Sequence, residues 1–383
     1  MKIRGISVFN EKPIEVEIKE GFIENIDLLP GSEQNLPYIS PGFFDIQVNG
    51  YKGSDYSLED FSEGHLRNII TNLAASGTTQ HVPTIISSPQ ERILKNLEII
   101  SKAINTSSDI KEAIPGIHIE GPFISSEEGP RGCHDPSFIR NPDFEEFRQW
   151  QEAAEGRIVM VTIAPEREGS MDFIKKVTRT GVRIAIGHTG ATPEIIREAI
   201  KAGAQFSTHL GNGSYLILPK VNNCIWEQLA ADELFAGIIC DGFHLPASAV
   251  KVFARAKGLE RLILTSDVAL AGGLNPGIYK WGNMEVEVFK DGHLGLAGSD
   301  ILAGAGHLLD WDIAHFIRFT GNDLSKTIPL YTINPAKIIK MPYNYGKLEV
   351  GTPANLTLFH YQTGDDSLQI VYTLCKGKVI FKN

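Results

Sequence analysis

The stretch PGFFDIQVNGYKGSD, residues 41–55, contains a segment whose side chains alternate between apolar and polar. Successive side chains of a β-strand point to opposite faces, so this alternation predicts a strand with one apolar and one polar face. The apolar face would carry Phe44, Ile46 and Val48, and the polar face would carry Asp45, Gln47 and Asn49. A row of polar side chains on an otherwise buried strand requires a function.

Seven further apolar runs follow this strand, at 79–86, 114–119, 158–164, 182–186, 204–208, 235–240 and 262–266. Segments with helical periodicity lie between most of them. In TPEIIREAIKAG, residues 192–203, Thr192 can cap the helix, Pro193 suits its first turn and Gly203 ends it. Repeated strand-then-helix units with eight strands are typical of a closed parallel barrel. We therefore expect an α/β fold, a (β/α)8 TIM-type barrel over residues 41–343.

The two ends of the chain have a different pattern. Residues 1–40 and 344–383 contain short alternating segments such as EVEIK and NLTLFH, separated by turn residues and without a strong helical period. We expect these two ends to meet in one small β-sandwich domain.

Composition excludes several classes of protein. Of the 383 residues, 42% are hydrophobic and 21% are charged, which is ordinary for soluble globular proteins. No run of apolar residues is long enough to predict a membrane span. The start MKIRGISVFN lacks the charged and apolar regions of a secretory signal, so the expected compartment is the cytoplasm.

Charge and cysteine content argue against several kinds of partner and site. The net charge is −10, and no dense basic block is present, which argues against binding to nucleic acid or to an anionic membrane. The cysteines are scattered without a Cys-x-x-Cys spacing, which disfavours a disulfide framework and a thiolate zinc site. They are Cys133, Cys224, Cys240 and Cys375.

Polar residues that can bind metal follow several of the expected strands. They are His118 and Glu120 after the third strand, His188 after the fifth, His209 and Asn212 after the sixth, Asp241 and His244 after the seventh, and Asp267 after the eighth. In this fold the C-terminal ends of the strands form the active site. One glutamate and two histidines leave a coordination position open, as in a catalytic zinc site, and a nearby aspartate can then accept and donate a proton. We expect His118 to pack beside the site, and we assign the histidines outside these motifs to structural roles.

The order of the motifs along the chain resembles that of a known enzyme family. The motifs are PGFFDIQVNG, HIEGPF, CHDP, GHT, THLGN, DGFH, SDVALAGG and LAGSD, and they are followed by TINPAKII and GKLEVGTPANLTLF. This ordered series resembles the N-acetylglucosamine-6-phosphate deacetylases of the amidohydrolase superfamily. The similarity covers nearly the whole chain.

The resemblance implies one divalent metal ion per subunit, with Glu120, His188 and His209 as ligands. Many amidohydrolases have His-x-His at the end of the first strand, whereas this chain has Gln47 and Asn49, and amides are poor zinc ligands. One metal subsite is therefore expected to be absent. The expected ion is Zn²⁺, with Fe²⁺ and Mn²⁺ as alternatives.

The resemblance also assigns catalytic and substrate-binding roles. Asp267 is the expected proton acceptor and donor, and His134 is expected to polarise the acetyl carbonyl group. The implied substrate contacts are Cys133, His134, Asn212, Gly213, Lys220, His244, Leu296, Ala297 and Gly298. Lys220 replaces the arginine that is common at its position, and a lysine is a point charge instead of a two-pronged donor. In the family the neighbouring subunit completes the phosphate pocket, so a homodimer is expected.

The expected activity is hydrolysis of the N-acetyl group of N-acetyl-D-glucosamine 6-phosphate, giving D-glucosamine 6-phosphate and acetate. Lys220 and Asp300 leave open a related substrate, either N-acetylgalactosamine 6-phosphate or an unphosphorylated N-acetylhexosamine. The absence of His-x-His leaves open a barrel that binds a sugar without catalysis. The presence of Glu120, His188, His209 and Asp267 argues against that alternative.

Overall fold

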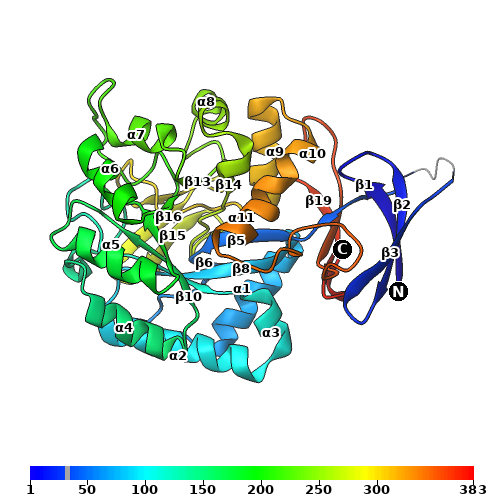
Figure 1. The fold of residues 1–383 in the computed structure, drawn as a ribbon, viewed down its shortest axis with the longest axis horizontal. Helices are drawn as coiled ribbons and strands as arrows, with labels where there is room; N and C mark the ends of the chain where they lie inside the picture. Colours follow the sequence, from blue (N-terminus) through cyan, green and yellow to red (C-terminus); the bar gives the residue numbers. More distant parts are fainter. Residues whose placement is uncertain (31–34) are drawn as a thin grey trace.

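A computed structural model of the chain describes residues 1–30 and 35–383, and its centre is a parallel barrel (Figure 1). In the described residues the barrel sheet has eight strands, which are neighbours in chain order. They are β5 (Phe43–Val48), β8 (Thr78–Ile86), β9 (Ile117–Glu120), β10 (Ile158–Ile163), β11 (Arg183–Ile186), β12 (Phe206–Ser207), β13 (Phe235–Ile238) and β14 (Leu262–Leu264). Each expected strand is present, so the prediction of a (β/α)8 barrel is confirmed.

Backbone hydrogen bonds join the first and last barrel strands. Just beyond β14, the Asp267 N–H donates to the Gln47 carbonyl oxygen at 3.0 Å, and the Asn49 N–H donates to the Val268 carbonyl oxygen at 2.9 Å. These bonds place Gln47, Asn49 and Asp267 at the same end of the barrel. All six side chains of β5 are buried: Phe43 packs in a cluster with residues of α9, and Phe44 and Ile46 pack in a cluster with residues of the other barrel strands.

Helices surround the barrel. They are α1 (Glu63–Ala75), α2 (Gln90–Thr106), α3 (Ser108–Ala113), α4 (Phe144–Ala153), α5 (Ser170–Arg179), α6 (Pro193–Ala202), α7 (Cys224–Ala230), α8 (Ala247–Lys257), α9 (Leu309–Thr320), α10 (Leu324–Thr327) and α11 (Ile333–Ile338). The ends of α6 follow the sequence, because the Thr192 side chain accepts a hydrogen bond from the Ile195 N–H and Gly203 ends the helix with a φ of 122°. This conformation favours glycine, which has no Cβ.

Both ends of the chain contribute to a second sheet beside the barrel, drawn in blue and red in Figure 1. In the described residues its order is β20-β19-β18-β4-β1-β2-β3. The strands are β1 (Lys2–Ser7), β2 (Pro13–Lys19), β3 (Phe22–Leu28), β4 (Tyr38–Pro41), β18 (Leu356–His360), β19 (Gln369–Cys375) and β20 (Lys378–Lys382). Val16 of β2 and Leu356 of β18 belong to one buried cluster, so the two ends of the chain share a core. The expected terminal β domain is thus present.

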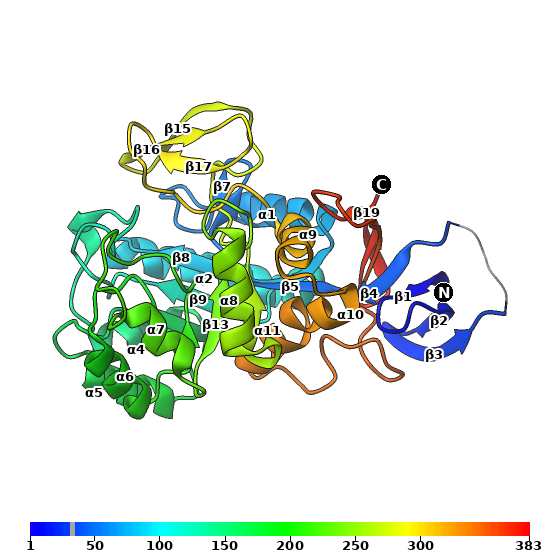
Figure 2. The same ribbon diagram turned by 90° about the horizontal axis from the view of Figure 1, so that it is seen from above.

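A small antiparallel sheet is inserted between β14 and α9. It consists of β15 (Gly277–Trp281), β16 (Met284–Val288) and β17 (Leu294–Leu296), and it lies over one end of the barrel near β7 (Ser54–Asp55), which pairs with β6 (Gly50–Tyr51) (Figure 2). Its buried cluster includes residues of the loop that follows β14, such as Ala269 and Leu270. The insert therefore covers the end of the barrel at which Asp267 lies.

Among the described residues, no helix combines the length and the apolar character needed to cross a bilayer.

Candidate active site

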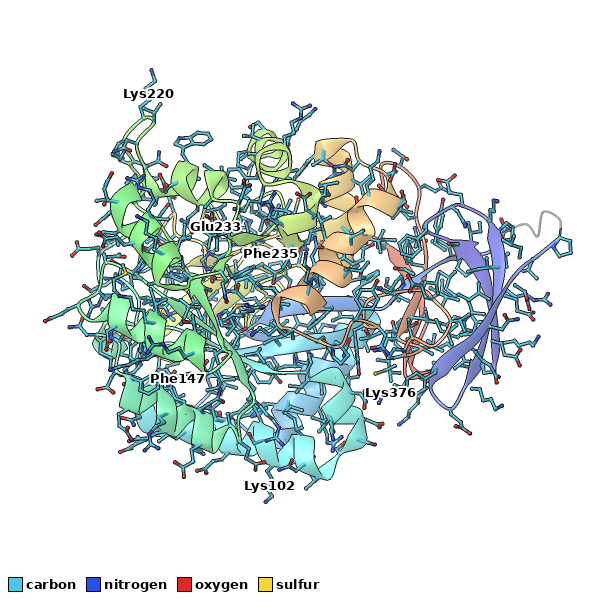
Figure 3. The ribbon with its side chains drawn as sticks, in the orientation of Figure 1. Lys102, Phe147, Lys220, Glu233, Phe235 and Lys376 are labelled. Carbon is cyan, nitrogen blue, oxygen red and sulfur yellow. The ribbon has the colours of Figure 1, made fainter. Side chains whose placement is uncertain are left out.

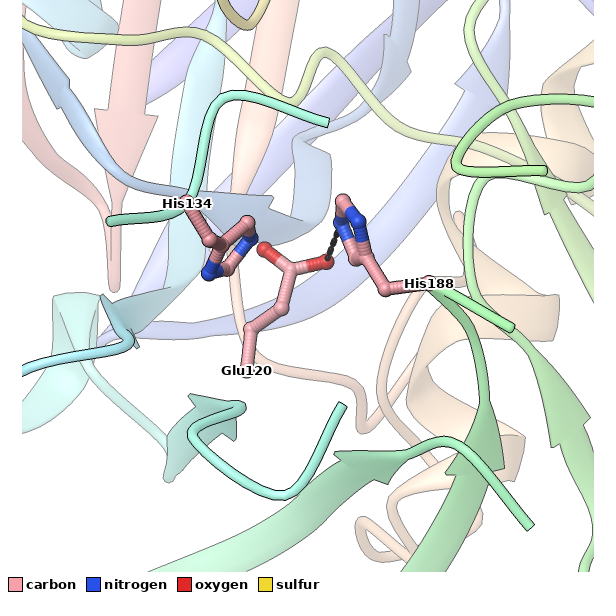
Figure 4. A group of neighbouring side chains, drawn as sticks. All are labelled: Glu120, His134 and His188. Atoms are coloured by element: carbon pink, nitrogen blue, oxygen red, sulfur yellow. Dashed lines mark ion pairs between the residues drawn. The ribbon is translucent and has the colours of Figure 1, made fainter. Parts of the chain in front are cut away.

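Three side chains, one at the end of β9, one after β11 and one after β12, converge on one point. The His209 Nε2 atom lies 3.0 Å from Glu120 Oε1 and 3.1 Å from His188 Nε2, and His188 Nε2 lies 3.4 Å from Glu120 Oε1. Figure 4 shows Glu120 and His188 facing each other, with His134 on the other side of the carboxylate. The side chains are almost fully buried.

This arrangement fits a divalent metal ion. Ligand atoms at about 2.0–2.1 Å from a tetrahedral ion are about 3.3 Å apart, close to the three separations between Glu120, His188 and His209. His188 donates its Nδ1–H to the Pro130 carbonyl oxygen at 2.9 Å, which leaves the lone pair of Nε2 directed at the centre. A ligand atom of His134 also lies within 4.8 Å of those of Glu120 and His188. His209 Nε2 lies only 3.0 Å from Glu120 Oε1 and 3.1 Å from His188 Nε2, and these shorter distances favour His209 as the third ligand.

The electrostatics of the centre favour a cation. Burial by itself would raise the pKa of Glu120, but hydrogen bonds and charges from His188 and His209 hold it well below its usual range. Burial lowers the pKa of His209, and Glu120 more than offsets that effect, so the value is raised. A carboxylate beside two imidazoles in a buried site is a typical ligand set for zinc and related ions.

The polar row of β5 faces this centre and donates hydrogen bonds. Gln47 Nε2 donates to Glu120 Oε1 and to Asp267 Oδ1, both at 2.9 Å, and Asn49 Nδ2 donates to Asp267 Oδ1 at 2.8 Å. These amides thus present N–H groups, not lone pairs, to both carboxylates. Asp45 lies deeper and accepts hydrogen bonds from Ser266 and from the Thr265 hydroxyl, which fixes the strand end that carries Asp267.

The pKa of Asp267 suits a general base. Burial, with the negative charge of Glu120, raises its pKa to about 6. Its carboxylate lines the central cavity, while Oδ1 is held by the side-chain amides of Gln47 and Asn49. A carboxylate with a pKa near the working pH can both accept and return a proton.

The His134 ring meets the His188 ring edge to face, with 4.4 Å between the ring centroids, and it is neutral, because burial lowers its pKa to about 3. The His134 Nδ1 atom is 2.8 Å from the Ser87 hydroxyl oxygen. When that hydroxyl donates to Nδ1, the ring proton resides on Nε2, and the neutral imidazole can donate it to an oxyanion.

The backbone is strained at several of these positions. His188, His209 and Asp267 have φ values of 48°, 27° and 53°. Such left-handed conformations are uncommon for residues other than glycine, and they concentrate at functional sites. Here they turn each side chain inward directly after a barrel strand.

The centre lies at the floor of a cavity of about 460 Å³. The structure brings most of the expected substrate contacts to its wall, namely Cys133, His134, Asn212, Gly213 and His244. Burial, with the charges of Asp267 and Glu120, raises the pKa of Cys133 to about 12, so the thiol is protonated. Among the described residues that line this cavity, none is a lysine or an arginine.

Lys220 is not brought to the cavity of its own chain. It is exposed on the loop before α7 and points away from the molecule (Figure 3). It lines a separate, largely apolar groove with Trp226 and Val252. Leu216 and Ile217 of the same loop are 87% and 90% exposed, so the loop offers apolar side chains as well as a charge.

Leu296, Ala297 and Gly298 are also not brought to the cavity. They lie at the end of β17 and in the following turn. A second Leu-Ala-Gly follows six residues later, at 302–304, and Leu302 and Gly304 line the cavity. The same tripeptide also occurs at 270–272, where none of its residues lines the cavity, and only the folded chain shows that the copy at 302–304 lies at the site. We therefore move the assignment from residues 296–298 to residues 302–304.

Part of the cavity wall was not predicted from the sequence. Trp281 at the end of β15, Ile86 at the end of β8 and Tyr215 line the cavity. Asp300, noted in the sequence for its negative charge, lines it as well. A single tryptophan such as Trp281 gives no sequence signal of this role, because its position depends on how the insert folds over the barrel.

The remaining buried histidines of the barrel have partners of their own. His118 Nε2 is 2.7 Å from the Thr162 hydroxyl oxygen, and burial lowers its pKa to about 4. His81 Nε2 is 2.6 Å from the Tyr56 hydroxyl oxygen. Both rings are thus paired with hydroxyl groups, and neither lines the cavity.

Comparisons with known proteins agree with this geometry. The model of the amidohydrolase family matches residues 38–380. The N-acetylglucosamine-6-phosphate deacetylase of Rattus norvegicus is 31% identical over 356 residues, covering 90% of this chain and 83% of the relative. That of Bacillus subtilis is 31% identical over 343 residues, covering 89% and 84%.

Solved structures are similar over the full length. The deacetylase of Thermotoga maritima has a TM-score of 0.87 at 26% identity and covers 100% of both chains. A mutant of the Mycobacterium smegmatis enzyme, solved in complex with N-acetyl-D-glucosamine 6-phosphate, has a TM-score of 0.87 at 25% identity and covers 99% of both chains. The chain therefore belongs to the amidohydrolase family, a family of metal-dependent hydrolases, and within it to the N-acetylglucosamine-6-phosphate deacetylases.

Proposed function

We propose that this chain hydrolyses the N-acetyl group of N-acetyl-D-glucosamine 6-phosphate, releasing acetate and D-glucosamine 6-phosphate in the catabolism of amino sugars. The observation that carries the proposal is the convergence of Glu120, His188 and His209 within 3.0–3.4 Å of one another, beside the carboxylate of Asp267. Relatives that match nearly the whole chain are deacetylases of this compound.

Glu120, His188 and His209 would hold one divalent ion, for which zinc is the first choice and iron or manganese are alternatives. When bound, such an ion lowers the pKa of a water molecule toward 7 and polarises a carbonyl group. Gln47 and Asn49 take the places of two further ligands, and their N–H groups face the carboxylates. The stoichiometry is therefore one ion per chain.

The chain's own residues then move the protons. Asp267 accepts a proton from the attacking water and passes it to the amide nitrogen, so that the leaving group departs as a neutral amine. His134 donates its Nε2–H to the acetyl oxygen, where negative charge develops. Both residues line the same cavity, which has room for an N-acetylated sugar.

The sugar would lie against Asn212, Gly213, His244 and the Leu-Ala-Gly at 302–304, with Cys133 close to the acetyl group. The 6-phosphate needs a cation, and the described cavity wall of one chain contains neither lysine nor arginine. Lys220, on its exposed loop, would supply this cation to the cavity of a second subunit. Homodimer formation through this loop would bury Leu216 and Ile217 and complete the phosphate site.

A residue of the same cavity supports a second candidate substrate. Asp300 adds a negative charge to the wall, which disfavours a phosphate and is compatible with a free hydroxyl group. An unphosphorylated N-acetylhexosamine is therefore the alternative substrate. For the 6-phosphate, the site of action is the cytoplasm, where sugar phosphates are found.

A substrate panel tests the proposal. Acetate release is measured for N-acetylglucosamine, N-acetylgalactosamine and their 6-phosphates, with zinc, iron or manganese added to metal-free protein. We expect the highest kcat/KM with N-acetyl-D-glucosamine 6-phosphate. A higher value with an unphosphorylated sugar would favour the alternative, and no release from any compound would exclude deacetylation of these sugars.

A further inference from the structure

The loop after β13 holds His244 in a fixed orientation. Its sequence is DGFH, and the buried carboxylate of Asp241 accepts three hydrogen bonds within it. Asp241 Oδ1 accepts from the backbone N–H groups of Phe243 and His244, both at 2.9 Å, and Oδ2 is 2.8 Å from His244 Nδ1. One carboxylate therefore fixes both the turn and the imidazole ring.

The loop is also anchored from outside. Trp311 of α9 donates its indole N–H to the carbonyl oxygen of Asp241 at 3.1 Å. The Trp311 ring stacks on His307 at a centroid distance of 4.1 Å, and the Phe243 ring stacks on His293 of the insert at 4.8 Å. The loop thus lies between α9 and the inserted sheet, so its position is set by the folded barrel.

These contacts decide which atom of His244 faces the ligand. Because a carboxylate only accepts hydrogen bonds, Nδ1 of His244 must carry a proton. Nε2 has no hydrogen-bond partner among the described residues, and the ring lines the cavity. In the neutral ring Nε2 is therefore an acceptor, suited to a hydroxyl group of the sugar, and in the protonated ring it is a donor, suited to a phosphate oxygen.

We propose that Asp241 is a positioning residue that sets the tautomer and orientation of His244, with Trp311 holding the backbone of Asp241. The inference rests on the proposed function, because it assigns to His244 a contact with the sugar substrate. It differs from that function in acting through His244, since Asp241 itself does not line the cavity.

The variant Asp241→Asn tests the inference with little change in shape. The two backbone N–H groups hold the amide oxygen of the new side chain, so its N–H₂ group faces His244 Nδ1. The neutral ring must then accept at Nδ1 and carry its proton on Nε2. The tautomer is observed by ¹⁵N NMR of histidine-labelled protein, at a pH at which the ring is neutral, with His244→Gln used to assign the signal.

We expect the unaltered chain to show the Nδ1–H form and Asp241→Asn to show the Nε2–H form. For the variant we also expect KM for N-acetyl-D-glucosamine 6-phosphate to rise on the order of tenfold, the effect of one misplaced hydrogen bond to a charged group, while kcat changes less than about threefold. A matched control is Asp312→Asn, which alters another fully buried carboxyl group of the same region that makes no hydrogen bond to His244.

Several results would overturn the inference. They are an Nε2–H tautomer in the unaltered chain, an unchanged tautomer in Asp241→Asn, or an equal rise of KM in Asp312→Asn. The measurement on the unaltered chain decides the matter even if the variant does not fold. Failure of the proposed function would show as a lack of acetate release by the unaltered chain, and the tautomers would still be measured.

Discussion

Replacing Asp267 with asparagine separates proton transfer from binding. The amide oxygen of the new side chain can still accept the hydrogen bonds that Gln47 and Asn49 donate to Asp267 at 2.9 and 2.8 Å. The metal ligands Glu120, His188 and His209 are unchanged. We therefore expect Asp267→Asn to fold, to retain its ion and to bind substrate, but to hydrolyse the amide slowly.

The expected loss can be estimated from the role of the group. A general acid–base residue contributes about 10²–10⁴-fold to the rate, or about 2.7–5.5 kcal/mol of activation free energy. Asp267 would serve two proton transfers, so we expect a loss near the upper end of this range. A residue that only supported the loop would cost far less, because both of its hydrogen bonds survive in the variant.

The pH dependence of the hydrolysis rate gives a second test of the role of Asp267. The pKa of Asp267 is raised to about 6 in the metal-free chain, so its base form predominates only above that pH. The positive charge of a bound ion lowers this pKa. The rate of the unaltered chain should therefore fall as the pH decreases, with the midpoint at or below about 6, and this limb should be absent in Asp267→Asn.

The assay combines acetate release from about pH 5 to 9 with metal analysis and calorimetric substrate binding. Asp55→Asn is the matched control, because Asp55 is equally buried and its pKa is raised to about 7 by burial, but it lies outside the cavity wall. A rate for Asp267→Asn within about threefold of the unaltered chain, far below the range for general acid–base groups, would refute the assigned role.

Three further predictions concern the surface and the fold. Lys220→Ala should raise KM for the 6-phosphate about tenfold and leave KM for the unphosphorylated sugar unchanged; an equal effect on both substrates would contradict a phosphate contact. Ile217→Asp should yield a monomer in sedimentation velocity, whereas the control Ile278→Asp, also at an exposed position, should not; a dimer in both would place the interface elsewhere. Thr192→Ala removes the N-cap of α6 and should lower the free energy of unfolding in urea by about 1 kcal/mol with activity retained; an unchanged free energy would mean that the cap does not contribute.

The fold was predictable because its signals are local. Each barrel strand is a short apolar run, and helices such as α6 begin and end at residues with strong preferences, here Thr192 and Gly203. These preferences act within a few residues, so they can be recognised without the tertiary structure. The pairing of strands from the two ends of the chain was also predictable, since both ends alternate and neither has a helical period.

Features that depend on contacts between distant parts of the chain were harder to predict from the sequence. The Leu-Ala-Gly at 302–304 contributes to the cavity wall while the copies at 270–272 and 296–298 do not, although all three are identical in sequence. The inserted strands β15–β17 and the position of Trp281 were not anticipated, because they follow from packing against the loop after β14. The position of Lys220 outside its own cavity likewise depends on a long loop whose path has no local signal.

The central claim is that one divalent ion, held by Glu120, His188 and His209, supports the deacetylation. The most direct measurement is a titration of metal-free protein with Zn²⁺, in which bound metal and acetate release from N-acetyl-D-glucosamine 6-phosphate are followed together. We predict that activity is absent without metal, rises in proportion to bound ion and reaches its plateau at one ion per chain, and that His209→Ala neither retains the ion nor regains activity. Full activity without metal, or a plateau at two ions per chain, would contradict the account.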